Sequence, residues 1–516
     1  MNSTRNSDQS HTGFILIFVA IKIVLNLFAI GHFGFQRDEL LHLALGDHLG
    51  WGFKEVPPFI ALLAKISTTI FGDSVFATRI FSTLFSGLII WFTGRLVIEF
   101  GGGKFGIALA CLAIIFSPAF AASGYLFQPV VFDQLWWLLT AYLVVRYINT
   151  SNAFYIYLIG VVIGVGLLTK YTMAFFAFAI IIALLLTKQR KVLWSKHILF
   201  AALIALLIFL PNIVWQFKHH LPLVTHMNKL RTQQLEYIKP SDFITQQLLV
   251  NGVALFVWLP GLLALLFSSK LAQYRFLALG YIVVFIFLLE MNGKSYYIFG
   301  AYPMLFSAGG YFFDQWLKTK HVAFRAAALT FLTLPNLILL PLALPILSLN
   351  QTLAVFKSLH FSPKWEDQKE HPLSQDYADM FGWDEMGEKV VKAYKSLTPD
   401  QQKHAQIYAD NYGEAGAVYH YGKRYNLPEV ASLNSSFTLW APDTLSAKYI
   451  IYVDDEGGGN VTKRLAPFIG KYTKLGEVES PWAREKGTAI FLIVDPKPEL
   501  NNIYQKELAQ KRLEQR

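Results

Sequence analysis

Long apolar segments constrain this chain more than any other feature. They fill most of residues 13–347, and many approach the roughly 20 residues that an α-helix needs to cross a bilayer. The composition agrees, because only 16% of the 516 residues are charged, against about 25% in typical soluble domains. An aromatic content of 15% also excludes an intrinsically disordered chain. We therefore expect a polytopic α-helical membrane protein.

The apolar segments predict eleven transmembrane spans. They cover residues 13–33, 77–98, 105–123, 131–148, 155–169, 171–187, 197–215, 247–267, 275–291, 296–316 and 322–347. Residues 1–12 are polar and lack the pattern of a cleavable signal, so we expect the first span to be retained.

Basic residues in the short loops predict the orientation. They follow the sixth, eighth and tenth spans: Lys188, Arg190, Lys191, Lys196, Lys270, Arg275, Lys318, Lys320 and Arg325. The positive-inside rule places all of them in the cytoplasm, with the N-terminus inside and the segment after Leu347 outside. The same rule accounts for the net charge of +10, so nucleic acid is not an indicated partner. The predicted location is the plasma (inner) membrane.

A change of composition near residue 350 marks a domain boundary. Residues 350–516 are charged, contain many Pro and Gly residues and include no run that could span a membrane. Strand-like stretches at 405–409, 448–453 and 489–494 alternate with helical patterns such as 413–424, which predicts an α/β domain. We expect a transmembrane domain over 1–349 and an extracytoplasmic (periplasmic) domain over 350–516. The single cysteine, Cys111, excludes an intramolecular disulfide and a cysteine-rich zinc site.

With this topology, carboxylates, cations and histidines gather on the outer side of the membrane. The candidate residues there are Arg37, Asp38, Glu39, Glu55, Asp133, Lys170, His219, His220, Lys294, Tyr296 and Tyr297. Cations bind phosphate, and a carboxylate accepts a proton from an incoming nucleophile, so the mixture favours a reaction on a lipid-linked anionic substrate. The alternative is a transporter or lipid flippase, which would more often place charges at the middle of broken helices.

Structural explanations also exist for several of these residues. Acidic side chains in residues 37–39 fit an ordinary helix start. The two histidines fit an interfacial loop, and Lys294 could extend to lipid headgroups. Gly160 and Gly164 form a small-xxx-small pair that predicts close helix packing.

Several motifs resemble family 39 glycosyltransferases, which include protein O-mannosyltransferases and lipid A aminoarabinose transferases. The resemblance rests on FQRDEL at 35–40, WGFKEVPP at 51–58, Asp133, GLLTKY at 166–171, GKSYY at 293–297 and NYGEAGA at 411–417. It covers most of the chain. Val56 departs from the pattern, because aminoarabinose transferases carry a lysine directly before the Pro-Pro pair.

This resemblance implies a GT-C fold with about eleven transmembrane helices and a polyprenyl-phosphate sugar as donor. The acceptor would be lipid A, a cell-envelope glycan or a protein, and transfer would invert the anomeric centre. Asp38 matches the catalytic carboxylate with Glu39 beside it, and Glu55 and Asp133 match further acidic positions. Donor-phosphate contacts are expected from Lys294, Tyr296, Tyr297, Arg37 and Lys170, while His219 and His220 are candidates on the acceptor side. A divalent metal ion is compatible with this chemistry but not required.

Overall fold

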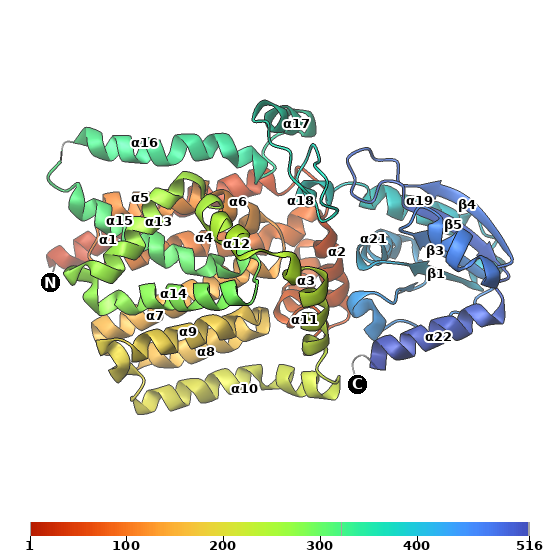
Figure 1. Cartoon of the computed structure of the whole chain (residues 1–516), viewed down its shortest axis with the longest axis horizontal. Coiled ribbons are helices and arrows are strands. Elements are labelled where there is room, and N and C mark those ends of the chain that lie inside the picture. The colour runs from red at the N-terminus through yellow and green to blue at the C-terminus, as the bar shows by residue number, and fades with distance from the viewer. Residues whose placement is uncertain (1, 321, 514–516) are drawn as a thin grey trace. The chain divides into compact units, whose positions relative to one another are not determined.

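The computed structural model describes residues 2–320 and 322–513, and its elements are drawn in Figure 1. Contacts divide the chain into two compact units. Unit 1 comprises Met1–His32, Arg79–Val214 and Asn228–Ser348. Unit 2 comprises Phe33–Thr78, Trp215–Met227 and Leu349–Arg516. Thus two segments that precede residue 349 group with the C-terminal segment.

Unit 1 is built from helices that coincide with the predicted apolar segments. They are α1 (Asn2–Ala29), α4 (Val75–Glu99), α5 (Lys104–Phe116), α6 (Pro118–Tyr125), α7 (Pro129–Thr150), α8 (Phe154–Thr169), α9 (Thr172–Leu185), α10 (Lys196–Lys218), α12 (Pro240–Leu249), α13 (Leu255–Phe267), α14 (Arg275–Glu290), α15 (Tyr302–Trp316) and α16 (Val322–Leu339). Every predicted span overlaps one helix or one consecutive pair of helices. Helix α4 begins, and helix α10 ends, within unit 2.

Fewer than eleven of these segments satisfy the length and hydropathy expected of a membrane span. Five do so among the described residues, and seven if the bent pairs α5–α6 and α12–α13 each count as one. The bends are 64° and 95°. Helices α8 and α9 are apolar but have only 16 and 14 residues, fewer than the roughly 20 needed to cross a bilayer without help from neighbours.

Small residues allow the helices of unit 1 to approach closely. A Cβ on Gly106 of α5 would lie 2.7 Å from the carbonyl oxygen of Gly310 in α15. The prediction for Gly160 and Gly164 is confirmed, because both face α10: a Cβ on Gly164 would lie 2.8 Å from Cβ of Ile208, and one on Gly160 would meet the backbone of Ala201. Backbone contact of this kind replaces the hydrophobic effect as the force that joins helices in lipid.

Unit 2 contains a five-stranded mixed sheet in the order β2-β1-β3-β5-β4. The strands are β1 (Ala405–Ala409), β2 (Val430–Ala431), β3 (Tyr449–Asp454), β4 (Lys471–Glu477) and β5 (Ala489–Val494). Strands β2, β1 and β3 are parallel, whereas β5 is antiparallel to both β3 and β4. The three predicted strands and the predicted helix at 413–424 are confirmed. Strand β2 has only two residues, and β4 is an exposed edge strand without an apolar face, so neither carries the usual signal.

The helices of unit 2 cover both faces of the sheet. They are α2 (Arg37–Asp47), α3 (Phe59–Phe71), α17 (Leu349–Ser358), α18 (Gln375–Ala378), α19 (Trp383–Lys395), α20 (Pro399–Gln402), α21 (Tyr412–Gly422) and α22 (Pro498–Leu513), with α11 (Pro222–Gln233) shared with unit 1. Apolar residues of α22 pack on the face that carries Tyr408 and Tyr452. Helices α19 and α21 contact the strands as well as each other.

Helix α2 packs against both α3 and α21. A Cβ on Gly46 would lie 2.9 Å from Cβ of Ala64 in α3, and one on Gly416 of α21 would lie 3.0 Å from Cβ of Leu40. These two close approaches fix α2, and with it the charged residues at its N-terminus.

Candidate functional site

The charged triplet 37–39 forms the first turn of α2. Gln36 is the N-cap, and its side-chain oxygen accepts a hydrogen bond from the backbone N–H of Asp38 at 2.8 Å. The carboxylate of Glu39 accepts one in return from the backbone N–H of Gln36, also at 2.8 Å. This capping box fully buries Glu39 and leaves Arg37 and Asp38 partly exposed. Glu39 therefore serves the helix start, and Asp38 is the more accessible carboxylate.

Asp38 is held by a residue distant in sequence. The hydroxyl of Tyr412 donates a hydrogen bond to Oδ1 of Asp38 at 2.8 Å. The guanidinium of Arg37 lies 4.4 Å from the centroid of the same tyrosine ring, within the range of a cation–π contact. Burial of Tyr412 and the adjacent carboxylate raise the pKa of its hydroxyl well above its usual value, so the hydroxyl remains a donor at neutral pH.

The motif NYGEAGA places Tyr412 at the first position of α21. Asn411 is the N-cap, and its side-chain oxygen accepts hydrogen bonds from the N–H groups of Gly413 and Glu414 at 2.9 and 3.0 Å. Gly413 must lack a side chain, because a Cβ there would lie 2.8 Å from Cγ of Arg37. The motif thus shapes a helix start that accepts the Arg37–Asp38 pair.

A buried ion pair lies beside Arg37. The backbone N–H of Arg37 donates to the carbonyl oxygen of Asp379 at 3.1 Å, and the carboxylate of Asp379 pairs with Arg484 at 3.2 Å. Burial raises the pKa of Asp379 to about 7, although Arg484 and Arg37 oppose this shift. Nε of Arg37 is itself buried without a hydrogen-bond partner among the described residues. An unmet buried donor is costly, so this atom is suited to an anionic group.

Glu55 is bound by two serines. The hydroxyls of Ser435 and Ser436 donate to its two carboxylate oxygens, the second at 2.6 Å. The backbone N–H of Lys54 donates to the Ser436 hydroxyl at 3.0 Å. These contacts fasten the loop 51–58 to the 3-10 helix η8 (Ser435–Leu439). The structure gives Glu55 an anchoring contact and no hydrogen bond to Asp38.

In unit 1, Asp133 lies one turn inside the N-terminus of α7. Its two carboxylate oxygens accept hydrogen bonds from Nε1 of Trp137 at 3.0 Å and from the hydroxyl of Thr172 at 2.7 Å. Only 5% of its surface is exposed. Both donors lie on helices of the same unit, so Asp133 is a fixed, largely dry carboxylate.

Lys170 lies at the C-terminus of α8 and faces two aromatic rings. Its ammonium group is 4.8 Å from the ring centroid of Tyr296 and 4.9 Å from that of Tyr297. Electrostatic attraction to Asp133 and repulsion from Lys294 act on the same group. Unit 1 therefore brings together one carboxylate, two lysines and two tyrosines: Asp133, Lys170, Lys294, Tyr296 and Tyr297.

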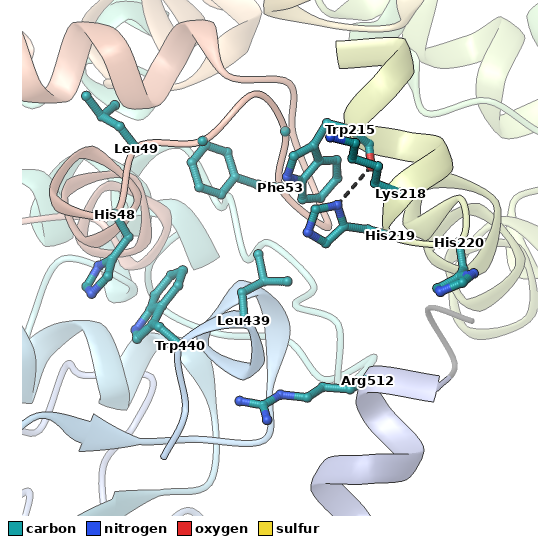
Figure 2. Close-up of a pocket in the computed structure, with 12 residues that line it drawn as sticks. His48, Leu49, Phe53, Trp215, Lys218, His219, His220, Leu439, Trp440 and Arg512 are labelled. Carbon is teal, nitrogen blue, oxygen red and sulfur yellow. Dashed lines mark hydrogen bonds between the residues drawn. The ribbon is translucent and has the colours of Figure 1, made fainter. Parts of the chain in front are cut away.

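His219 and His220, at the end of α10, line a cavity of about 510 Å³ within unit 2 (Figure 2). Nδ1 of His219 bonds to the carbonyl oxygen of Trp215 at 2.9 Å, and the two rings stack at 4.3 Å. His220 has a positive φ of 60° and ends the helix. Neither histidine touches Asp38 in the contacts observed.

A cluster of three carboxylates lies at the carboxyl ends of β1 and β3. Oxygen atoms of Asp410, Asp454 and Asp455 are within 4.8 Å of one another. Such oxygens suit hard divalent cations, but the amide of Asn460 already donates to all three, at 3.1 to 3.3 Å. Burial raises the pKa of Asp410 to about 7. No predicted site residue belongs to this cluster, so we assign no reaction step to a metal.

Sequence reasoning did not identify several contact residues. Tyr412 binds Asp38 from a distant segment, and the pair of Asp379 and Arg484 flanks Arg37 in the same way. Thr172, two residues after Lys170, binds the distant Asp133. Tyr412 carried a signal, because it lies in the NYGEAGA motif and directly inside an N-x-x-E capping box.

Three comparisons with known proteins bear on this arrangement. Residues 55–215 match the family model for dolichyl-phosphate-mannose-protein mannosyltransferases, a span that includes Glu55, Asp133 and Lys170. No curated protein sequence is significantly similar to the chain. Among solved structures, ArnT from Cupriavidus metallidurans bound to undecaprenyl phosphate aligns with 12% identity and a TM-score of 0.64, covering 93% of this chain and 98% of that one. ArnT in the apo state aligns with 13% identity and a TM-score of 0.63, covering 94% and 98%.

The chain has the ArnT fold. Nearly full coverage of both chains means that the apolar helices and the C-terminal sheet domain both belong to the match. This confirms the prediction of a helical GT-C membrane protein with a smaller α/β domain. At 12–13% identity the likeness to ArnT establishes the fold, and function must be argued from the residues.

Proposed function

We propose that this protein is an integral membrane glycosyltransferase that takes its sugar from a polyprenyl-phosphate donor. The observation that carries the proposal is the alignment over nearly the whole chain with ArnT, whose structure was solved with undecaprenyl phosphate bound. The match of residues 55–215 to a family described as using dolichyl-phosphate-mannose supports the same class of donor. The acceptor is a lipid, glycan or protein on the extracytoplasmic side.

We assign the binding of the donor phosphate to cationic side chains. Lys170 and Lys294 repel each other electrostatically, and an anion between two such groups relieves that repulsion. Tyr296 and Tyr297 hold the Lys170 ammonium by their rings and present hydroxyl groups. In unit 2, Nε of Arg37 is buried without a hydrogen-bond partner among the described residues, which keeps Arg37 a separate candidate for contact with an anionic group. Charge-assisted hydrogen bonds to phosphate stabilise the negative charge that develops as the phosphate leaves.

Asp38 is assigned the role of general base. The acceptor oxygen or nitrogen attacks the anomeric carbon, and the bond between that carbon and the phosphate oxygen breaks. The phosphate departs with the bonding electron pair, and Asp38 takes the proton from the attacking group. One base and one leaving phosphate give a single displacement with inversion. We assign supporting roles to Asp133 and Glu55, because both oxygens of each carboxylate already accept hydrogen bonds from protein groups.

The second candidate class is a transporter or lipid flippase. Two bent helix pairs within the apolar unit, α5–α6 and α12–α13, are features that transporters also have. The two classes differ in product: a transferase cleaves the bond between sugar and phosphate, whereas a flippase leaves it intact.

Replacement of Asp38 tests the assignment of the base. Asp38→Asn keeps an oxygen that accepts from Tyr412 but removes the proton acceptor, so transfer should fall about 100- to 10,000-fold. Envelope glycans and lipids of a deletion strain carrying each variant are compared by mass spectrometry. The matched control is Asp47→Asn at the other end of the same helix, where the carboxylate pairs with Lys65 and Lys423; it should retain normal product. Normal product from Asp38→Asn would exclude Asp38 as the base.

A further inference from the structure

The cavity in unit 2 has features that its packing does not explain. It is lined by the end of α2, the loop after it, the end of α10, η8 and α22: His48, Leu49, Gly50, Gly52, Phe53, Trp215, Lys218, His219, His220, Leu439, Trp440 and Arg512 (Figure 2). Its volume of about 510 Å³ falls within the roughly 300–1,000 Å³ of small-molecule sites. The chain therefore has room for one or two sugar rings outside the residues assigned above.

The charge on the cavity wall has one sign. Lys218 and Arg512 are cations, and none of the twelve lining residues is a carboxylate. Arg512 is paired with Asp443 at 2.6 Å, and His48 contacts Glu429 at 3.0 Å. The side chain of Lys218 has no hydrogen-bond or ion-pair partner in the part of the chain that is described, so its charge is available to a ligand.

Aromatic rings supply the rest of the wall. The ring of His48 stacks on Trp440 at 4.2 Å, nearly parallel, and the ring of His219 stacks on Trp215 at 4.3 Å. Each histidine thereby stiffens an indole. Both ring nitrogens of His48 are bonded, to the carbonyl oxygen of Ala44 and to Glu429, so the polar edge beside the apolar surface comes from His219. Rigid aromatic faces next to hydrogen-bonding groups suit a saturated ring that has both C–H and O–H groups.

We propose that this cavity binds an anionic saccharide as the acceptor side of the reaction. The inference rests on the proposed transferase function. Lys218 selects a phosphate or carboxylate on the sugar, because the guanidinium of Arg512 already donates to Thr438, Ala441 and Asp443. Trp215 and Trp440 contact the ring. His219 and His220 thereby gain a specific role, in acceptor binding rather than in catalysis.

Titration calorimetry on the full-length protein in detergent tests this site. The probes are trehalose 6-phosphate, trehalose and inorganic phosphate, with no donor lipid present. We expect saturable binding of trehalose 6-phosphate at least about tenfold tighter than that of either simpler probe, because sugar and charge are both recognised. Equal affinity for inorganic phosphate, or no saturable binding of trehalose 6-phosphate, would overturn the proposal.

A double variant links binding to the named residues. Lys218→Gln with His220→Gln changes two exposed side chains and should weaken binding of trehalose 6-phosphate about five- to tenfold. The matched control is Lys357→Gln, because Lys357 is also an exposed lysine in the last turn of a helix of unit 2; binding should not change. Unchanged binding by the double variant would also overturn the proposal. Since no donor lipid is present, Asp38→Asn should bind trehalose 6-phosphate as the wild type does. The binding experiment therefore tests the cavity proposal independently of the proposed transferase activity.

Discussion

At the scale of single residues, the hydrogen bond between Tyr412 and Asp38 is the contact that most directly supports the proposed chemistry. It joins groups 374 positions apart at 2.8 Å. A hydroxyl that donates to a carboxylate oxygen fixes the direction of that carboxylate. Tyr412 is therefore a positioning residue for the proposed base.

Tyr412→Phe should lower the turnover rate about fivefold to tenfold, the effect of one hydrogen bond to a charged group. The change is measured as the initial transfer rate of the purified variant against that of the wild type. Tyr421→Phe on the same helix is the control and should keep the wild-type rate. An unchanged rate for Tyr412→Phe would exclude a positioning role for Tyr412.

At the scale of elements, the packing of α8 on α10 depends on the absence of a side chain at Gly160. Gly160→Val would press against the backbone of Ala201 and should destabilise the protein by about 1–3 kcal/mol. The control is Gly13→Val in α1, where a Cβ meets nothing within 4 Å. Thermal unfolding in detergent should show a lower Tm for the first variant only. Equal Tm values would mean that the helices separate or adjust at no cost.

Helix α21 also contains a pH-sensitive residue. Burial lowers the pKa of His420 from 6.5 to about 4, where its ring packs on Phe35 at 4.7 Å. The stability contribution is complete above pH 6.5 and is lost as the pH falls toward 4, because the unfolded chain takes up the proton first. The free energy of unfolding should drop by about 2 kcal/mol between pH 8 and 5.

The variant His420→Gln isolates this effect, since glutamine does not titrate. Denaturant titrations in detergent at both pH values should show a smaller pH dependence for His420→Gln than for the wild type. The exposed His404→Gln serves as the control and should behave as the wild type. An identical pH dependence in all three proteins would show that His420 is not responsible.

Local features of the elements were predictable from sequence, and distant contacts were not. Apolar runs located the helices, and short stretches rich in β-forming residues located β1, β3 and β5, because both patterns lie within one segment. The charged triplet at 37–39 does begin a helix. By contrast, Glu55 contacts Ser435 and Ser436, which lie 380 and 381 positions further along the chain. Five described helices, or seven with the bent pairs, meet the length and hydropathy of a span, so the number of eleven spans stays a prediction.

At the scale of the whole molecule, nearly the full chain follows the ArnT fold, although the family model covers only residues 55–215. Fold can be retained at 12% identity because packing needs only apolar residues of suitable size at the contacts. We propose that substrate choice depends on fewer residues, such as Val56 and those lining the cavity. The sugar and acceptor therefore require experiment.

The most direct test of the account is release of free polyprenyl phosphate. The purified protein in detergent is mixed with polyprenyl-phosphate sugar and acceptor extracted from the membranes of a deletion strain, with no second compartment and no membrane potential. We predict that the wild type releases free polyprenyl phosphate as glycosylated acceptor forms, whereas Asp38→Asn does not. An intact donor after incubation with the wild-type protein, together with donor movement across vesicle membranes, would contradict the account and identify a flippase.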